Sequence, residues 1–141
     1  MIIDRTNKRI LALLEQNARL SAAAVGREIG LSRPAVQDRI AAMEQQGVIK
    51  GYHAETDERA GLTHAVLFVR IAERPCDRAL RWLASLDGVA AVASLSGETD
   101  ALVTVALPSV SELAALNDTV AASPLIASSL SQVVLKRLTG V

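Results

Sequence analysis

The stretch "IGLSRPAVQDRI", residues 29–40, decides how the first third of the chain folds. Gly30 is followed after one residue by Ser32, and Pro34 stands two positions later. Glycine favours the left-handed backbone that ends a helix, serine caps the next helix, and proline is tolerated in a first helical turn. The stretch therefore predicts two helices that are joined by the short turn "GLS".

The flanking sequence extends this pair to three helices. Apolar residues recur at the spacing of a helix face in each segment. Thr6 or Asn7 can cap the first helix, Ser21 can cap the second, and Gly47 can end the third. The helices are expected at residues 7–16, 22–29 and 33–46.

Gly26 lies inside the second expected helix, where glycine costs about 1 kcal/mol relative to alanine. Such a residue is tolerable if another helix must cross close above it. Together with the tight turn and the capped third helix, Gly26 predicts a helix-turn-helix.

The third helix has an apolar and a polar side. At roughly 100° per residue, Val36, Ile40 and Met43 share one face, and the polar side chains point the other way. A recognition helix inserts its N-terminal half into the major groove of DNA. The residues expected to contact DNA are Arg27, Ser32, Arg33, Pro34, Gln37, Asp38 and Lys50.

These residues are expected to have different roles. Arg33 can pair with guanine and Gln37 with adenine, whereas Asp38 can accept from a cytosine amino group or orient Arg33. Ser32 and the helix N-terminus can hold a phosphate, and Arg27 and Lys50 are placed for backbone contacts. Exposed arginines are more often simply solvated, and for Arg39, nearer the apolar face, we favour a structural ion pair.

The rest of the chain changes character. Residues 51–62 read as a polar linker, and a short strand is expected at 49–54. Strands are then expected at 63–72, 89–97, 100–107 and 126–138, with helices at 75–86 and 109–120. The order β-α-β-β-α-β predicts a ferredoxin-like unit. The fold class is thus α+β, with a helix-turn-helix domain at 1–50, the linker at 51–62 and the second domain at 63–141.

The first strand of the second domain is apolar on both faces. Ala65 and Leu67 alternate with Val66 and Phe68. An antiparallel sheet needs only one face against its own helices, so the second apolar face predicts packing against a second copy of the chain. The interpretation is a two-fold homodimer.

Composition and charge restrict the class of protein. Residues 1–50 carry eight Lys/Arg against five Asp/Glu, so this part is at +3 in a chain of formal net charge zero. That asymmetry suits a nucleic-acid-binding domain. The single cysteine, Cys76, excludes an internal disulfide and a cysteine-based zinc site and is expected to be a buried structural thiol. With no membrane-length apolar run and no signal peptide, a cytoplasmic protein without membrane association is expected.

Across its length the sequence resembles the Lrp/AsnC, or feast/famine, family of regulators. The resemblance includes "NARLS" (17–21), "IGLS" (29–32), "GVIKGYHAETD" (47–57), "SGETDALVTV" (96–105) and "VVLKRL" (133–138). It implies a winged-type helix-turn-helix joined to a RAM/ACT-like domain that dimerises and often assembles into tetramers or octamers. It also implies a transcriptional regulator that binds double-stranded DNA and responds to an amino acid.

The resemblance places an effector pocket at the turn "SGETD". The residues expected there are Gly97, Glu98, Thr99 and Asp100. Thr99 can bond the carboxylate or amine of a ligand, and Asp100 can pair with its ammonium. The family tends to place an aromatic residue near Thr99 or Ala101, which this chain lacks. The alternative is an ordinary hairpin turn in which Asp100 bonds its own backbone.

Two other functions compete with a local regulator. One is an architectural protein that wraps DNA with little sequence preference, whose binding would depend strongly on salt. The other is a tetrapyrrole decarboxylase, since some proteins of this architecture act on a haem precursor through histidine and basic residues. Only His53 and His64 are present, without nucleophile–base or metal-ligand spacing, so we expect no catalytic residues, no metal and no cofactor.

Overall fold

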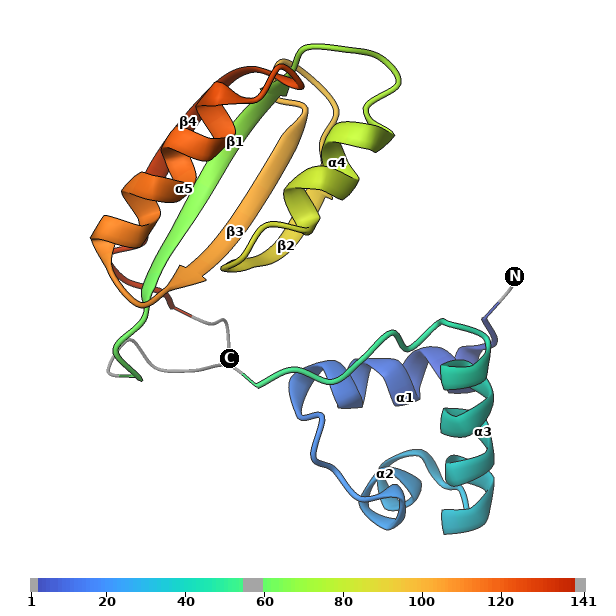
Figure 1. Cartoon of the computed structure of the whole chain (residues 1–141). Helices are drawn as coiled ribbons and strands as arrows, with labels where there is room; N and C mark the ends of the chain where they lie inside the picture. The colour runs from blue at the N-terminus through green and yellow to red at the C-terminus, as the bar shows by residue number, and fades with distance from the viewer. Residues whose placement is uncertain (1–2, 55–59, 139–141) are drawn as a thin grey trace. The chain divides into compact units, whose positions relative to one another are not determined.

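The computed structural model describes residues 3–54 and 60–138. The chain divides into two compact units, Met1–Glu55 and Thr56–Val141. The first unit is helical, and the second is a sheet with two helices (Figure 1). Each unit has its own hydrophobic core.

The first unit consists of the helices α1 (Arg5–Gln16), α2 (Ala22–Ile29) and α3 (Arg33–Gln45). Ser21 and Ser32 cap α2 and α3 as predicted. Helix α1 begins earlier than expected, and its cap is Asp4 rather than Thr6 or Asn7. The reason is that the Asp4 carboxylate accepts from the backbone N–H of Asn7 at 2.6 Å, which satisfies a first-turn donor.

Apolar side chains of all three helices meet in the core of this unit. Val36 and Met43 are buried as predicted, whereas Ile40 is only partly buried. Ile10, Leu14 and Val25 complete the core. Helix α3 thus has one inward face, which leaves the opposite face to solvent.

Gly26 is required by the turn between α2 and α3, and not by a crossing helix. A Cβ at this position would lie 2.4 Å from the backbone oxygen of Leu31. The N–H groups of Gly30 and Leu31 both donate to the Gly26 carbonyl, at 2.8 and 2.9 Å. Gly30 has a φ of 76°, the left-handed value that the sequence predicted.

Residues 49–54 form no strand, contrary to the expectation. A strand needs a neighbouring strand for its backbone bonds, and none of the described strands pairs with this segment. The segment is tied to the unit by a backbone bond from the Ile49 N–H to the Met43 carbonyl, at 3.1 Å, and by a side-chain bond from the Tyr52 hydroxyl to Glu44 Oε1, at 2.7 Å.

The second unit follows the predicted order β-α-β-β-α-β. Its elements are β1 (Thr63–Ile71), α4 (Asp77–Ala84), β2 (Val89–Ser94), β3 (Ala101–Leu107), α5 (Val110–Ala122) and β4 (Ile126–Val133). The strands form an antiparallel sheet in the order β2-β3-β1-β4. A capping box opens α5, because Ser109 accepts from the Glu112 N–H and bonds the Glu112 carboxylate.

Strand β4 ends at Val133, earlier than the expected 138. Its last ladder bond runs from the N–H of Val134 to the carbonyl of His64. Since β1 begins at Thr63, the chain beyond that bond has almost no partner strand left.

The two faces of the sheet differ in their cover. Helices α4 and α5 cover one face (Figure 1), where Leu67 and Val103 are buried with Leu83 and Leu113 of these helices. The other face carries the alternate residues of the strands. There Phe68 pairs with Leu102 on one side and with Leu130 on the other, and the Leu130 side chain is 60% exposed.

Candidate nucleic-acid interface and effector loop

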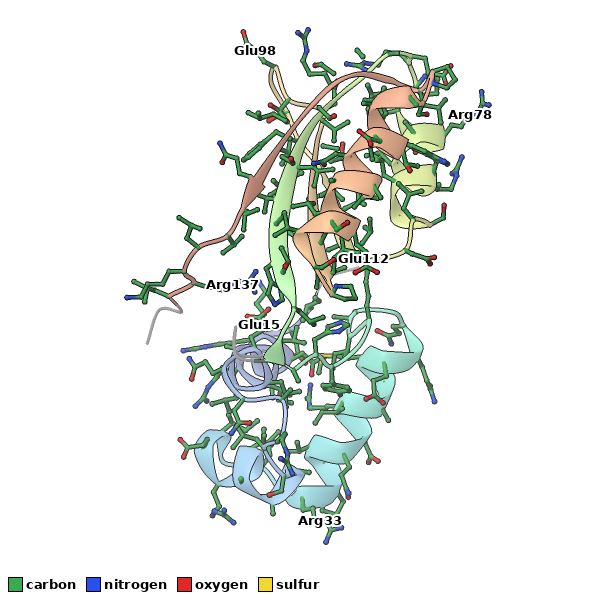
Figure 2. The ribbon with its side chains drawn as sticks, turned by 60° about the vertical axis from the view of Figure 1, so that its left-hand side comes forward. Glu15, Arg33, Arg78, Glu98, Glu112 and Arg137 are labelled. Atoms are coloured by element: carbon green, nitrogen blue, oxygen red, sulfur yellow. The ribbon has the colours of Figure 1, made fainter. Side chains whose placement is uncertain are left out.

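The polar face of α3 is open to solvent. Its exposed residues, all among those expected to contact DNA, are Ser32, Arg33, Pro34, Gln37 and Asp38. Figure 2 shows Arg33 at the first turn of α3, with its side chain pointing away from the helices. The fold therefore presents the first two turns of α3 as a surface that can enter a groove.

Two further cations of the first unit are also exposed to solvent. Arg27 is exposed in the last turn of α2, and Lys50 is exposed after the end of α3. The structure thus leaves all seven of the expected DNA-contacting residues accessible, although their contacts with DNA stay a prediction.

Arg39 has the structural role that the sequence favoured. Its guanidinium donates to Asp4 Oδ2 at 2.7 Å and to Asn7 Oδ1 at 2.9 Å. These bonds tie α3 to the start of α1. The backbone bond from Asn7, and then Arg39, lower the pKa of the Asp4 carboxyl below its usual 3.8.

The bond between Tyr52 and Glu44 ties the linker to the end of α3. Accepting a bond from the hydroxyl, the Glu44 carboxylate raises the pKa of Tyr52 above 10.0, with a smaller effect from burial. Sequence reasoning missed this contact.

The expected effector loop connects β2 to β3. Gly97 has a φ of 112°, and Glu98 is exposed at the turn. Thr99 is half-buried. The loop is closed by two backbone bonds of Asp100, whose N–H donates to the Val69 carbonyl while its own carbonyl accepts from Leu95, both at 2.9 Å.

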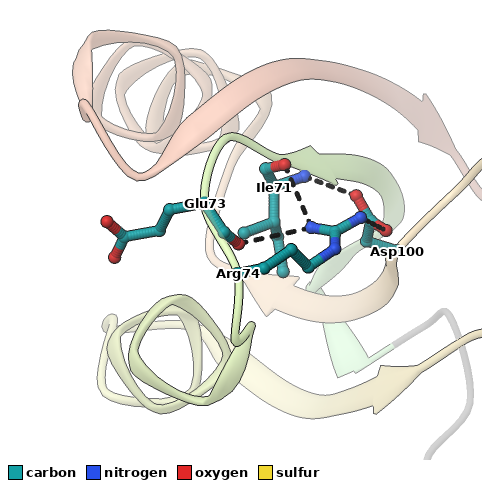
Figure 3. Close-up of polar contacts among 4 residues, drawn as sticks. All are labelled: Ile71, Glu73, Arg74 and Asp100. Atoms are coloured by element: carbon teal, nitrogen blue, oxygen red, sulfur yellow. Dashed lines mark hydrogen bonds and ion pairs between the residues drawn. The ribbon is translucent and has the colours of Figure 1, made fainter.

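The Asp100 carboxylate is engaged by groups of β1 and of the segment after it (Figure 3). Oδ2 accepts from the backbone N–H of Ile71 at 2.7 Å, and Oδ1 accepts from Arg74 Nη2 at 2.6 Å. The alternative in which the Asp100 side chain bonds the backbone of its own turn is therefore wrong. The N–H of Ile71 is available because the pairing of β1 with β3 ends at Val69 and Ala101.

Arg74 is the residue of this region that the sequence did not reveal. It lies 26 positions before Asp100, in the segment between β1 and α4. Besides its bond to Asp100, its Nη1 donates to the carbonyls of Ile71 and Glu73, both at 3.3 Å (Figure 3). The Arg74 side chain remains 62% exposed, whereas that of Asp100 is 13% exposed.

The histidines, the cysteine and the lengths of the helices bear on whether the chain could be an enzyme or a membrane protein. His53 is exposed in the first unit, while His64 lies on β1 in the second, with a buried Nε2 that has no partner among the described residues. Within residues 3–54 and 60–138, no cluster of His, Cys, Asp or Glu could hold a metal ion. None of the described helices is long and apolar enough to span a bilayer. Cys76 is half-buried at the start of α4.

Comparison with known proteins identifies both units. The AsnC-type helix-turn-helix domain matches residues 3–44, and the Lrp/AsnC ligand binding domain matches residues 64–139. The chain is 37% identical over 100 residues to the HTH-type transcriptional regulator LrpA1 of Halobacterium salinarum, covering 70% of each chain. It is 31% identical over 140 residues to the HTH-type transcriptional regulator Rv2324 of Mycobacterium tuberculosis, covering 96% of this chain and 94% of the other.

Solved structures share the fold at lower identity. The crystal structure of PH0061 matches with a TM-score of 0.86 at 13% identity, covering 99% of this chain and 97% of the other. That of the regulator NMB0573 from Neisseria meningitidis, a complex with L-Met, matches with a TM-score of 0.76 at 23% identity, covering 99% of this chain and 94% of the other. Since the two domain matches together account for most of its length, the chain belongs to the Lrp/AsnC family of helix-turn-helix transcriptional regulators.

Proposed function

We propose that α3 reads an operator sequence in the major groove, with Arg33 and Gln37 on base edges and Ser32, Arg27 and Lys50 on phosphates. The observation that carries this proposal is that α3 has one buried apolar face and one exposed polar face. Its Val36 and Met43 are buried, while its first two turns expose only polar side chains and Pro34. Major-groove recognition uses this arrangement, with the N-terminal half of the helix at the bases.

The experiment compares one arginine inside the interface with one outside it. Selection from a random DNA pool supplies the operator, and binding is then measured for Arg33→Ala and Arg19→Ala. Arg19 is an exposed arginine of the same unit, between α1 and α2, so the two variants lose the same charge. Arg33→Ala should cost about 1–3 kcal/mol on the operator and relax one base position. Equal losses on operator and random DNA would refute base reading and favour a DNA-wrapping protein.

The uncovered face of the sheet supports a homodimer in which two such faces pack together. Half-buried Val66, Phe68 and Leu102 lie there with the exposed Leu130. An apolar sheet face of this kind is unfavourable in water, and a second copy covers it with an identical face.

A pair of equally exposed residues tests this face. Leu130 is 60% exposed on the uncovered face, whereas Val110 is 62% exposed at the start of α5. Leu130→Asp should reduce the mass measured by light scattering from two chains towards one, because the dimer would bury its charge. Val110→Asp should leave the mass unchanged. A dimer that survives Leu130→Asp would show that this face is not the interface.

We also propose that an amino acid regulates DNA binding through the loop of Gly97, Glu98, Thr99 and Asp100. The match of residues 64–139 to a ligand binding domain supports an effector, and the L-Met complex of the Neisseria protein supports its class. A thermal-shift screen of the twenty L-amino acids tests the proposal. Stabilisation by none of them would refute it.

A further inference from the structure

The loop that precedes β3 contains a carboxylate that already has a cationic partner. Both oxygens of Asp100 accept short bonds, at 2.7 Å from the Ile71 N–H and at 2.6 Å from Arg74. The side chain is largely buried, at 13% exposed. A ligand ammonium that paired with it in place of Arg74 would have to displace that side chain.

Such a displacement is unfavourable for a small ligand in solution. Arg74 is tethered to the same chain, so its effective concentration at Asp100 is in the range of millimolar or higher. An ammonium that takes its place exchanges one cation for another and gains little. Asp100 is therefore suited to hold Arg74 rather than to bind an effector directly.

Arg74, by contrast, presents charge to solvent. Three acceptors fix its guanidinium: Asp100 Oδ1 and the carbonyls of Ile71 and Glu73. A guanidinium has more N–H groups than these bonds use, and the Arg74 side chain is 62% exposed. A planar cation that is fixed from one side is well suited to receive a carboxylate from the other.

We propose that Arg74 is the effector's carboxylate receptor and that Asp100 is its positioning residue. The effector would then be recognised by an anionic group, so that its carboxylate is required and its ammonium is secondary. This inference rests on the proposed amino-acid response and specifies which group of the amino acid the loop reads.

The test uses the full chain and a set of matched compounds. Each L-amino acid that raises the melting temperature is compared with its carboxamide, which lacks the carboxylate, and with its 2-oxo acid, which lacks the ammonium. Dissociation constants are measured by calorimetry. The carboxamides should bind at least about tenfold more weakly than the amino acids, while the 2-oxo acids should retain most of the affinity.

Variants assign this preference to Arg74. Arg74→Gln should weaken binding of the amino acid about tenfold, and Arg74→Lys should weaken it less, because the charge remains and the planar fork is lost. Arg78→Gln is the control: Arg78 is 75% exposed nearby in the sequence and lies 3.7 Å from Glu73. It should bind within about twofold of the wild type, since that exposed pair contributes little.

Arg74→Gln also leaves the largely buried Asp100 carboxylate without its cation, which could weaken binding by loosening the loop. The double variant Arg74→Gln/Asp100→Asn removes both charges and keeps an acceptor for the Ile71 N–H. It should fold as the wild type does and still lose the carboxylate preference. Recovery of wild-type affinity in the double variant would overturn the receptor role of Arg74.

The remaining outcomes separate this inference from the proposed function. Amino acids that bind Arg74→Gln as tightly as the wild type would overturn the role of Arg74 and leave the amino-acid response intact. No thermal shift with any amino acid would overturn both.

Discussion

Substitution of Gly26 by alanine tests whether the turn between α2 and α3 is as tightly packed as the structure indicates. Alanine should favour α2 by about 1 kcal/mol through its helix propensity. However, its Cβ would lie 2.4 Å from the backbone oxygen of Leu31, and real Cβ contacts stay beyond 3.0 Å. The turn must therefore move by at least 0.6 Å.

That movement is resisted by bonds within the turn itself. The N–H groups of Gly30 and Leu31 donate to the carbonyl of Gly26. Moving Leu31 away from residue 26 would therefore strain these hydrogen bonds. Overpacking of this kind costs about 1–3 kcal/mol, and a backbone atom has fewer ways to yield than a side chain. If the upper part of that range, about 2–3 kcal/mol, applies to this backbone contact, subtraction of about 1 kcal/mol of helix propensity leaves a destabilisation of the helical unit by about 1–2 kcal/mol.

The assay is thermal and denaturant unfolding of the full chain, monitored by circular dichroism and by hydrogen exchange in α2 and α3. Ala23→Gly, on the same helix, is the control that measures the propensity difference alone. Gly26→Ala should lower the melting temperature of the helical unit by about 5–10 °C and weaken operator binding, because α3 follows the turn directly. A variant that is more stable than the wild type would refute the close approach of Leu31 to Gly26.

Two further predictions concern the ties at the ends of α3. Tyr52 is the only tyrosine, so tyrosinate absorbance reports its ionisation. Its raised pKa means that the Glu44 bond stabilises the fold below pH 10.0 and is lost as the pH rises through the higher folded value. Glu44→Gln removes the negative charge and should therefore lower the midpoint of the Tyr52 titration towards 10.0. For Asp4, the lowered pKa means that its contribution is present above pH 3.8 and is lost as the pH falls through the folded value. Asp4→Asn, which keeps a capping oxygen, should make unfolding by acid less steep below pH 3.8, and an unchanged profile would contradict the bond to Arg39.

Sequence reasoning succeeded where the determinants of structure lie a few residues apart. Ser21, Gly30 and Ser32 act on backbone groups within a turn of their own position, so the boundaries of α2 and of the start of α3 follow from the sequence. The alternation in residues 63–72 likewise separated two faces of β1, of which the structure buries the one with Ala65 and Leu67. For this reason the exposed polar side of α3 could be predicted residue by residue.

Prediction failed where an element depends on a partner elsewhere in the chain. The segment 49–54 has suitable residues for a strand, but strand formation requires a second edge that no described residue supplies. The expected extension of β4 to residue 138 failed because β1 begins at Thr63. The early start of α1 is an exception, because its determinant is local: Asp4, and not Thr6 or Asn7, is the acceptor in reach of the first turn.

The contact of Arg74 with Asp100 shows the same limit in the candidate effector site. The sequence places Asp100 in a turn, where the bonds of its side chain would be local, but the pairing of β1 with β3 ends at Val69 and leaves the N–H of Ile71 to its carboxylate. That bond orients Asp100, and Asp100 in turn fixes a cation that lies 26 residues away in the sequence. The loop's chemistry then depends on the end of β1 as much as on its own residues. The resemblance carried by "SGETD" locates the loop in the sequence. Which charged side chain the loop offers to a ligand follows only from the pairing of the strands.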